Sequence, residues 1–172
     1  MSKRPIINIP DPILRKVAAA IERVDADVRR LADDMLESMY GAPGIGLAAP
    51  QVGVSRRLIV TDTSADKDKP TPLVMINPKI VRLGPQTATH EEGCLSIPDV
   101  KVDVERPTTL IVEFVDRDGK VQELSVDGLL ATAVQHEIDH LDGRLIIDYL
   151  SRLKRDIIVR RFRKQARIEP AD

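Results

Sequence analysis

Two histidines four residues apart constrain this chain more than any other feature of its sequence. Residues 136–140 read His-Glu-Ile-Asp-His, and the mostly apolar stretch 129–134 precedes them. Residues four apart on a helix lie on the same face, so His136 and His140 can share one metal ion with the carboxylate of Glu137 beside it. The whole chain has three histidines, and two of them belong to this motif. The spacing therefore predicts a metal site carried by a helix.

A third protein ligand must come from another part of the chain, because a catalytic site of the zinc type has three protein ligands and one open position. Cys94 is the only cysteine, and Gly93 before it allows the backbone to turn sharply or approach a metal closely. A lone cysteine is more often a small buried apolar side chain. His90 is an alternative ligand, although its neighbours Glu91 and Glu92 favour a strand edge. Two surface histidines on a solvated helix would be the simplest alternative to a metal site.

Composition is typical of a globular protein and excludes several classes. A length of 172 residues suits one domain, 1–172, with 42% hydrophobic and 31% charged residues. A net charge of −1 gives no overall attraction for DNA. No apolar run is long enough for a membrane span or typical of a signal peptide. One cysteine cannot form an internal disulfide, so we expect a cytoplasmic location. We also expect a monomer.

The hydrophobic pattern predicts helices and strands in one α+β domain. Apolar residues at helical spacing predict helices from 12 to about 17, from 26 to 40, from 128 to just before Gly143, and after Ser151. The predicted N-terminal caps of these four helices are Asp11, Asp25, Asp127 and Ser151. Short apolar or alternating runs predict strands at 58–60, 73–76, 80–83, 100–104, 108–115 and 121–126. Asp118-Gly119 joins the last two strands as a hairpin. We predict mostly antiparallel sheets around a buried central helix that carries the histidines, with a C-terminal helix.

Positive charge is concentrated at the C-terminal end. Residues 151–167 hold eight basic side chains and one acidic side chain, a net charge of +7. This predicted helix could dock on ribosomal RNA through phosphate contacts. It could equally be a solvated helix that covers the sheet with one face, whose apolar side would consist of Leu153, Ile157, Ile158 and Phe162. Residues 168–172 are expected to form a frayed tail.

Three motifs, taken together and in order, resemble the three signatures of peptide deformylases. They are Gly-Ile-Gly-Leu-Ala-Ala-Pro-Gln at 44–51, Glu-Gly-Cys-Leu-Ser at 92–96 and Gln-His-Glu-Ile-Asp-His at 135–140. The resemblance extends from about residue 10 to residue 150, and the basic last helix is similar to that of bacterial members. In zinc peptidases with the same helix motif the third ligand typically follows the motif, whereas here the cysteine precedes it.

The resemblance implies a metal-dependent hydrolase that removes the formyl group from N-formylmethionine at the start of nascent polypeptides. Cys94, His136 and His140 would hold the metal, which would lower the pKa of a bound water so that a metal-bound hydroxide is available. Glu137 would be the general acid and base.

The same resemblance implies how the substrate is held. The Gln51 side-chain amide and the Leu95 backbone N–H would donate to the oxyanion of the tetrahedral intermediate, although Gln51 taken alone could be a turn residue. The substrate contacts would come from small and apolar residues on both sides of the site: Ile45, Gly46, Gly93, Leu129 and Ala133.

Ligand type and family resemblance lead to different expectations for the identity of the metal. A Cys-His-His set with one open position suggests zinc, whereas the resemblance implies Fe(II), with nickel, cobalt or zinc able to occupy the same site. We expect one divalent ion, Fe(II).

We also predict that Glu92 pairs with Arg106 and so fixes the cysteine loop. A zinc endopeptidase and a non-enzymatic metal or redox sensor are the alternatives, and the sensor would not need Glu137.

Overall fold

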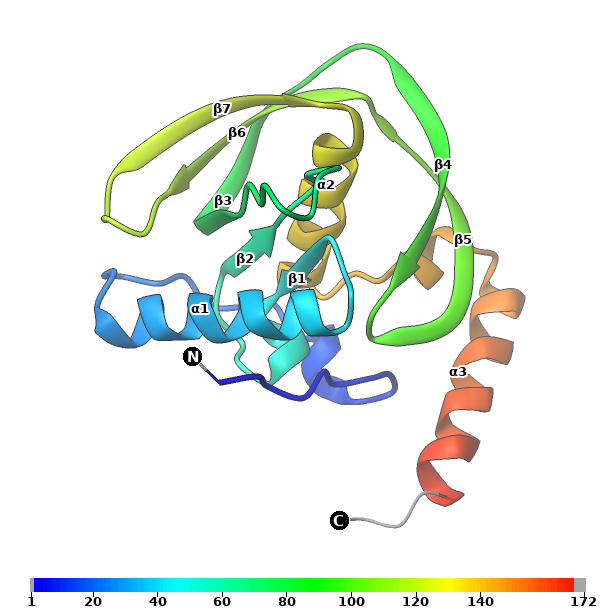
Figure 1. The fold of residues 1–172 in the computed structure, drawn as a ribbon. Coiled ribbons are helices and arrows are strands. Elements are labelled where there is room, and N and C mark those ends of the chain that lie inside the picture. The colour runs from blue at the N-terminus through cyan, green and yellow to red at the C-terminus, as the bar shows by residue number, and fades with distance from the viewer. Residues whose placement is uncertain (1, 169–172) are drawn as a thin grey trace.

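The computed structural model describes residues 2–168, and its sheets surround one central helix, α2 (Gly128–Leu141) (Figure 1). Five strands form one sheet in the order β1-β2-β3-β6-β7: β1 (Gly46–Ala48), β2 (Leu58–Thr61), β3 (Leu73–Leu83), β6 (Thr109–Val115) and β7 (Val121–Asp127). The other two strands form a ribbon: β4 (Thr87–Cys94) and β5 (Ile97–Pro107). Every neighbouring pair is antiparallel. The predicted α+β class is confirmed.

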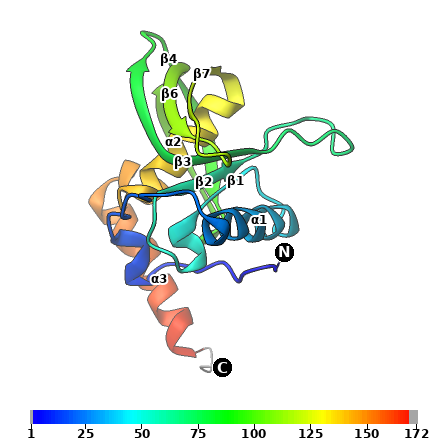
Figure 2. The same ribbon diagram turned by 90° about the vertical axis from the view of Figure 1, so that its left-hand side faces the viewer.

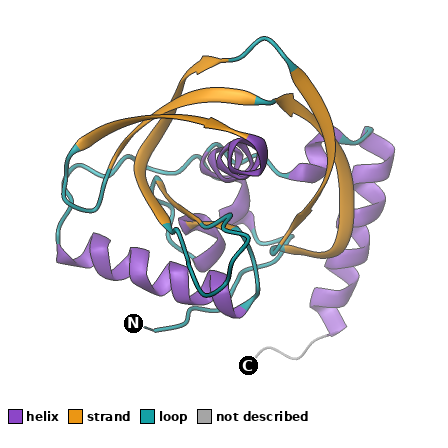
Figure 3. Cartoon of the chain, turned by 45° about the horizontal axis from the view of Figure 1, so that its top comes forward, coloured by secondary structure: helices purple, strands orange, loops and turns teal. Residues whose placement is uncertain are grey.

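The central helix is enclosed because most of its surface is apolar. Figure 3 looks nearly along α2 and shows the strands arranged around it. Ala131, Val134 and Leu141 are buried against the five-stranded sheet in one apolar cluster. α2 begins directly after Asp127, as predicted, but the Asp127 side chain makes no capping hydrogen bond. The prediction that this carboxylate caps the helix is therefore wrong.

The helix α1 (Ala26–Gly41) follows its sequence pattern closely. The Asp25 carboxylate accepts a hydrogen bond of 2.9 Å from the Val28 N–H, which is the expected N-cap contact. Residues at helical spacing then face the sheet and are buried: Val28, Leu31, Ala32, Met35 and Met39. They pack against β1 and β2 and so support the strand that borders the site.

Four other elements differ from the prediction. The helix expected at residues 12–17 is a single 3₁₀ turn, η1 (Pro12–Arg15). The runs 73–76 and 80–83 belong to one strand, because Asn77 adopts a positive φ of 50° where the pairing with β6 shifts register. β1 and β4 were not predicted as strands, and β1 is too short to show an alternating pattern. The loop between β2 and β3 projects from the body (Figure 2).

The C-terminal helix α3 (Arg152–Ile168) lies outside the β4–β5 ribbon. Its predicted cap forms, since Ser151 Oγ accepts a 3.3 Å hydrogen bond from the Lys154 N–H. The predicted apolar side is wrong in part, because Leu153 and Ile157 are 69% and 56% exposed and only Phe162 is buried. Ile168 still belongs to the helix, and the rest of the expected frayed tail, 169–172, lies outside the described residues. None of the helices described is both long and apolar enough to cross a membrane.

Candidate active site

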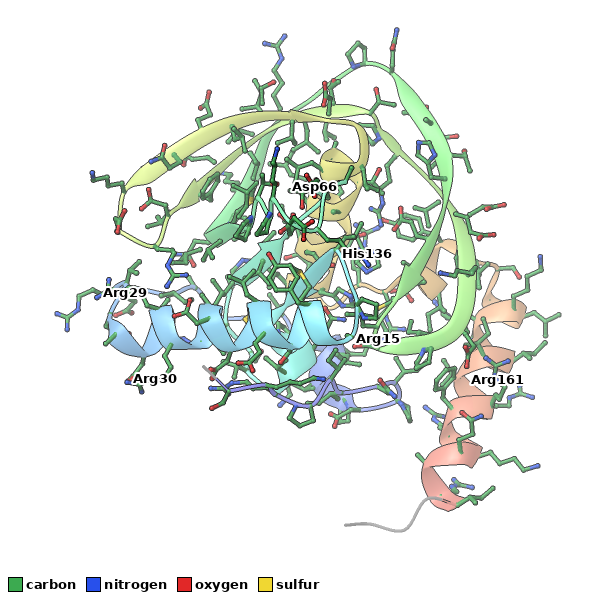
Figure 4. All side chains as sticks on the ribbon, viewed as in Figure 1. Arg15, Arg29, Arg30, Asp66, His136 and Arg161 are labelled. Carbon is green, nitrogen blue, oxygen red and sulfur yellow. The ribbon has the colours of Figure 1, made fainter. Side chains whose placement is uncertain are left out.

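The predicted metal ligands meet at the side of α2 that faces the end of β4. Cys94 ends β4, while His136 and His140 lie one helical turn apart on α2. One ligand atom from each of the three residues lies within 4.8 Å of the others. Cys94 Sγ is 3.4 Å from His140 Nε2. Both histidines are buried, and His136 is labelled in Figure 4.

The residues present fit a single metal ion. His136 Nδ1 is bound to Glu92, so its Nε2 is the nitrogen left for a ligand bond. A thiolate and two imidazoles are a donor set suited to a divalent transition metal. Burial, followed by repulsion from His136, lowers the pKa of His140 well below its usual value, so this imidazole is neutral as a ligand must be.

A buried carboxylate orients the first histidine. Glu92 Oε1 lies 3.0 Å from His136 Nδ1, and both residues are less than 10% exposed. Arg106 binds the same carboxylate twice, through Nε at 2.7 Å and Nη2 at 3.0 Å. Burial opposes ionisation of Glu92, but hydrogen bonds from His136 and Arg106 outweigh it and lower the pKa of Glu92. The structure therefore contains the Glu92–Arg106 pair that the sequence predicted.

Arg106 also contacts two residues that the sequence did not indicate, Asp139 and Tyr149. We call Glu92, Arg106, Asp139 and Tyr149 the Arg106 network. Arg106 Nη1 lies 3.0 Å from Asp139 Oδ2 and 3.2 Å from the Tyr149 hydroxyl. That hydroxyl donates to Asp139 Oδ2 at 2.7 Å. Because Asp139 immediately precedes His140 on α2, the network supports the second histidine through the helix as well as the first through Glu92. It joins β4, β5, α2 and the short helix η3 (Ile146–Tyr149).

Glu137 is buried beside the ligands with one oxygen free. Glu137 Oε1 lies 4.0 Å from His136 Nε2, and Glu137 Oε2 has no hydrogen-bond partner among the described residues. Burial raises the pKa of Glu137 to about 7. A Cβ at residue 46 would lie 2.6 Å from Glu137 Oε1, so glycine at this position lets β1 pass directly over the carboxylate. Gly46, predicted to contact substrate, is therefore next to Glu137, the predicted general acid and base.

The two predicted oxyanion donors lie next to Cys94. Gln51 is 1% exposed, and its Oε1 accepts a 2.9 Å hydrogen bond from the Ala48 N–H. This bond fixes the orientation of the amide, whose Nε2 lies 3.0 Å from Ser96 Oγ and 3.7 Å from Cys94 Sγ. Leu95 follows Cys94 in the turn between β4 and β5. The turn thus brings the Leu95 backbone close to the cysteine.

A groove of about 920 Å³ opens over these residues, and we call it the metal groove. It is lined by residues 42–46, which lead into β1, by β4 and by the first turns of α2. All five predicted substrate contacts line it: Ile45, Gly46, Gly93, Leu129 and Ala133. Sequence reasoning missed Ile6 and Pro43, which also line the groove. Neither belongs to a motif with recognisable chemistry.

Comparison with known proteins gives one consistent result. A family model described as polypeptide deformylase matches residues 3–156. A peptide deformylase of Rhizobium meliloti is 57% identical over 99% of this chain and 98% of its own length. Crystal structures of peptide deformylases from Ehrlichia chaffeensis, in complex with actinonin, and from Legionella pneumophila are 37% and 42% identical, with TM-scores of 0.89 and 0.86. They cover 96% and 98% of this chain and 98% and 100% of their own.

These matches span nearly the whole chain and include its fold, so they do not depend on the three motifs alone. They lend no support to the endopeptidase or sensor alternatives. The chain therefore belongs to the peptide deformylase family, metal-dependent hydrolases that remove the N-formyl group from nascent polypeptides.

Proposed function

We propose that Cys94, His136 and His140 hold one divalent metal ion that serves this deformylation. The observation that carries the proposal is the convergence of the three ligand atoms within 4.8 Å, at the base of an open groove. When bound, the ion would supply Lewis-acid chemistry, polarising the formyl carbonyl and making water more acidic. The His136 contact with Glu92 would keep the imidazole in the tautomer that binds metal.

Glu137 moves the proton in this proposal. Its free Oε2 accepts a proton from the water whose oxygen attacks the formyl carbon, and the carboxyl then delivers that proton to the amide nitrogen as the C–N bond breaks. The products are formate and a peptide with a free amino group. The pKa of about 7 for Glu137 suits a group that must take up and release a proton near neutral pH.

Gln51 and Leu95 stabilise the negative charge that develops on the formyl oxygen. The Ala48 N–H donates to the Gln51 oxygen, so the amide nitrogen is already directed towards Cys94. The side chain therefore needs little reorganisation during the reaction. The backbone N–H of Leu95 is the second donor. Loss of one such donor typically lowers the rate by on the order of 100-fold or more.

The metal groove receives the start of the polypeptide in an extended conformation. β1 is the edge strand of its sheet, and β4 belongs to a ribbon of two strands, so both present backbone groups to an added strand. Glycines at 46 and 93 allow close approach from both sides. Leu129 and Ala133 of α2 offer an apolar surface for the methionine side chain.

Fe(II) is the metal we expect, with nickel, cobalt or zinc able to replace it. The deciding experiment is formate release from a formyl-Met peptide by protein purified without oxygen, with an acetyl-Met peptide as the control and metal content measured on the same sample. Formate release only from the formyl substrate, in proportion to iron or nickel, supports reaction and metal together. Activity that follows zinc alone would contradict the assignment of iron.

The basic helix α3 is proposed to dock on ribosomal RNA. Its basic residues are mostly exposed, and phosphate contacts make such binding weaken steeply with salt. Cosedimentation with ribosomes at increasing salt tests this, using charge reversal at Arg160 and Arg163. Binding that survives both the reversal and high salt would contradict docking through α3.

The remaining proposals concern the protein as a whole. We propose a monomer of one cooperative domain that works in the cytoplasm, where nascent polypeptides are made. Sedimentation equilibrium and a single unfolding transition followed by two spectroscopic probes test the first two points. A concentration-dependent mass would contradict the monomer.

A further inference from the structure

A second groove, of about 860 Å³, lies between the N-terminal segment and the C-terminal half of α3, and we call it the α3 groove. Pro98 and Asp99 line both this groove and the metal groove. The N-terminal segment borders both as well, since Ile6 lines the metal groove and residues 8–12 line the α3 groove. The two grooves are therefore consecutive parts of one path across the surface.

The rim between the grooves is a bulge in β5. Cys94 pairs with Ile97, but Gly93 pairs with Lys101, so residues 98–100 have no partner on β4. Asp99 has a φ of 64°, in the left-handed region that aspartate tolerates better than most residues. Bulges of this kind redirect side chains and occur often beside active sites. Here Pro98 and Asp99 are turned outwards, towards both grooves.

The walls of the α3 groove carry the chemistry that binds a peptide backbone. Asn8 on the N-terminal segment and Gln165 on α3 line it from opposite sides, and both side chains are exposed. Each carboxamide offers a donor and an acceptor, the same pair that a peptide group presents. Ile9 and Phe162 give an apolar floor, and the Arg161 guanidinium lies 5.4 Å from the Phe162 ring centroid. Arg161 is labelled on α3 in Figure 4.

We propose that the α3 groove binds the polypeptide substrate from about its fourth residue onwards, after the chain has crossed the bulge at Pro98 and Asp99. The proposal rests on the proposed function, because it needs the formyl end at the metal ligands. An extended chain advances about 3.3 Å per residue, so about three residues span roughly 10 Å. Ile97 pairs with Cys94 and Pro98 follows it directly, so the bulge begins beside the end of β4 and a distance of this order takes the substrate past it.

The first test compares a formylated tripeptide with a formylated octapeptide that begins with the same three residues. Two added backbone hydrogen bonds and some apolar contact lead us to expect kcat/KM roughly three- to tenfold higher for the octapeptide, through a lower KM. Equal values for the two peptides would overturn the subsite. Failure to hydrolyse the tripeptide at all would instead overturn the proposed function, so the two failures are distinguishable.

Variants on α3 test whether the added residues of the octapeptide bind in the α3 groove. Arg161→Ala combined with Gln165→Ala should bring the octapeptide-to-tripeptide ratio close to one, with the tripeptide as the internal reference. The control combines Arg160→Ala with Lys164→Ala, which removes two long side chains, and one positive charge more than the test variant, from the same helix outside the groove. The control should keep the wild-type ratio. An unchanged ratio in the first variant, or an equal loss in the control, contradicts the assignment.

Photo-crosslinking locates the bound octapeptide without relying on its turnover. In metal-loaded protein carrying Glu137→Gln, an octapeptide with a photo-crosslinker at its sixth residue should react with segments 8–12 or 161–168. A crosslinker at the second residue should react instead within the metal groove. Crosslinks from the sixth residue to the projecting loop between β2 and β3, with none to α3 or the N-terminal segment, would show that the chain leaves in another direction.

Discussion

The Arg106 network and helix α3 are both rich in charge, but they hold it in opposite ways. Arg106 is 6% exposed, and its guanidinium contacts Glu92 and Asp139 at 2.7 and 3.0 Å. On α3 most charged side chains are exposed and only Phe162 is buried. In the first region each charge depends on a specific partner, so removing one group leaves another buried and unpaired. In the second region water already solvates the charges, so removing one of them leaves no buried group unpaired.

The largest expected effect within the buried region is on the rate. Glu137→Gln removes the group that we propose accepts the proton but keeps the size of the side chain, so kcat should fall on the order of 1000-fold or more. Metal content should stay at the wild-type level, because Glu137 is not one of the three ligands. Rates and metal content are measured on the same preparation. Activity within tenfold of wild type would remove Glu137 from the proposed mechanism.

The Arg106 network gives the next largest effect, now on stability. Arg106→Ala leaves the carboxylates of Glu92 and Asp139 without their cation, and losing one partner of a buried ion pair typically costs about 3–5 kcal/mol. Metal affinity should fall roughly 10- to 100-fold, because Glu92 no longer fixes His136. Denaturant unfolding and competition with a chelator measure the two effects.

The matched control for Arg106 is an ion pair at the surface. Arg117 and Asp33 lie 2.7 Å apart, but their side chains are 41% and 32% exposed. Arg117→Ala should change the free energy of unfolding by less than about 1 kcal/mol and leave metal affinity unchanged. Equal losses from the two arginine variants would show that burial does not distinguish the pairs.

A smaller effect tests how α3 is attached. Phe162 packs into the apolar cluster formed by β5, η1 and η3, so Phe162→Ala should cost about 3 kcal/mol. Leu153 is 69% exposed, and Leu153→Ala should change stability by no more than about 0.5 kcal/mol. Unfolding curves of both variants make the comparison. A large loss from Leu153→Ala would indicate that this side chain is covered in solution.

The two regions also differ in how far the sequence predicts them. The approach of Cys94 to His136 and His140 was expected because the ligands are scarce and the helical spacing is strict. The Glu92–Arg106 pair was predicted as well. Tyr149 was not, because a tyrosine on a short 3₁₀ helix ten residues after Asp139 has no local pattern that shows where its hydroxyl points.

Periodicity was less informative for α3 and for the bulge in β5. Leu153 and Ile157 are four residues apart, but they precede Phe162 by nine and five residues and therefore lie on other sides of α3 than Phe162, so the predicted apolar side combined two faces of the helix. The bulge at residues 98–100 depends on which residues of β4 and β5 pair, and pairing register is a tertiary property. The strong local signals, the Asp25 cap of α1 and the hairpin at Asp118-Gly119, were predicted correctly.

The smallest effect on stability is expected at Asp62. This residue tests what a buried carboxylate contributes when it takes no part in metal binding. Its carboxylate accepts hydrogen bonds from the Tyr40 hydroxyl at 2.5 Å and from the Ser64 and Thr71 N–H groups at 3.0 and 3.2 Å. Burial opposes ionisation, but these hydrogen bonds outweigh it and lower the pKa of Asp62 from 3.8 to about 2. A carboxyl group with a lowered pKa in the folded state stabilises the protein above its unfolded pKa and loses that contribution as the pH falls through its folded pKa.

The difference in unfolding free energy between wild type and Asp62→Asn should therefore be on the order of 1 kcal/mol above about pH 4 and shrink as the pH falls towards 2. Metal-free protein is used for both, so that acid release of the metal contributes to neither curve. Asp66→Asn, an exposed change in the projecting loop (Figure 4), is the control and should show no such dependence. A difference that stays constant from pH 5 to pH 2 would mean that the Asp62 hydrogen bonds stabilise the neutral acid as well as the carboxylate. The contribution of Asp62 to stability would then not depend on its charge, in contrast to the charged groups of the Arg106 network.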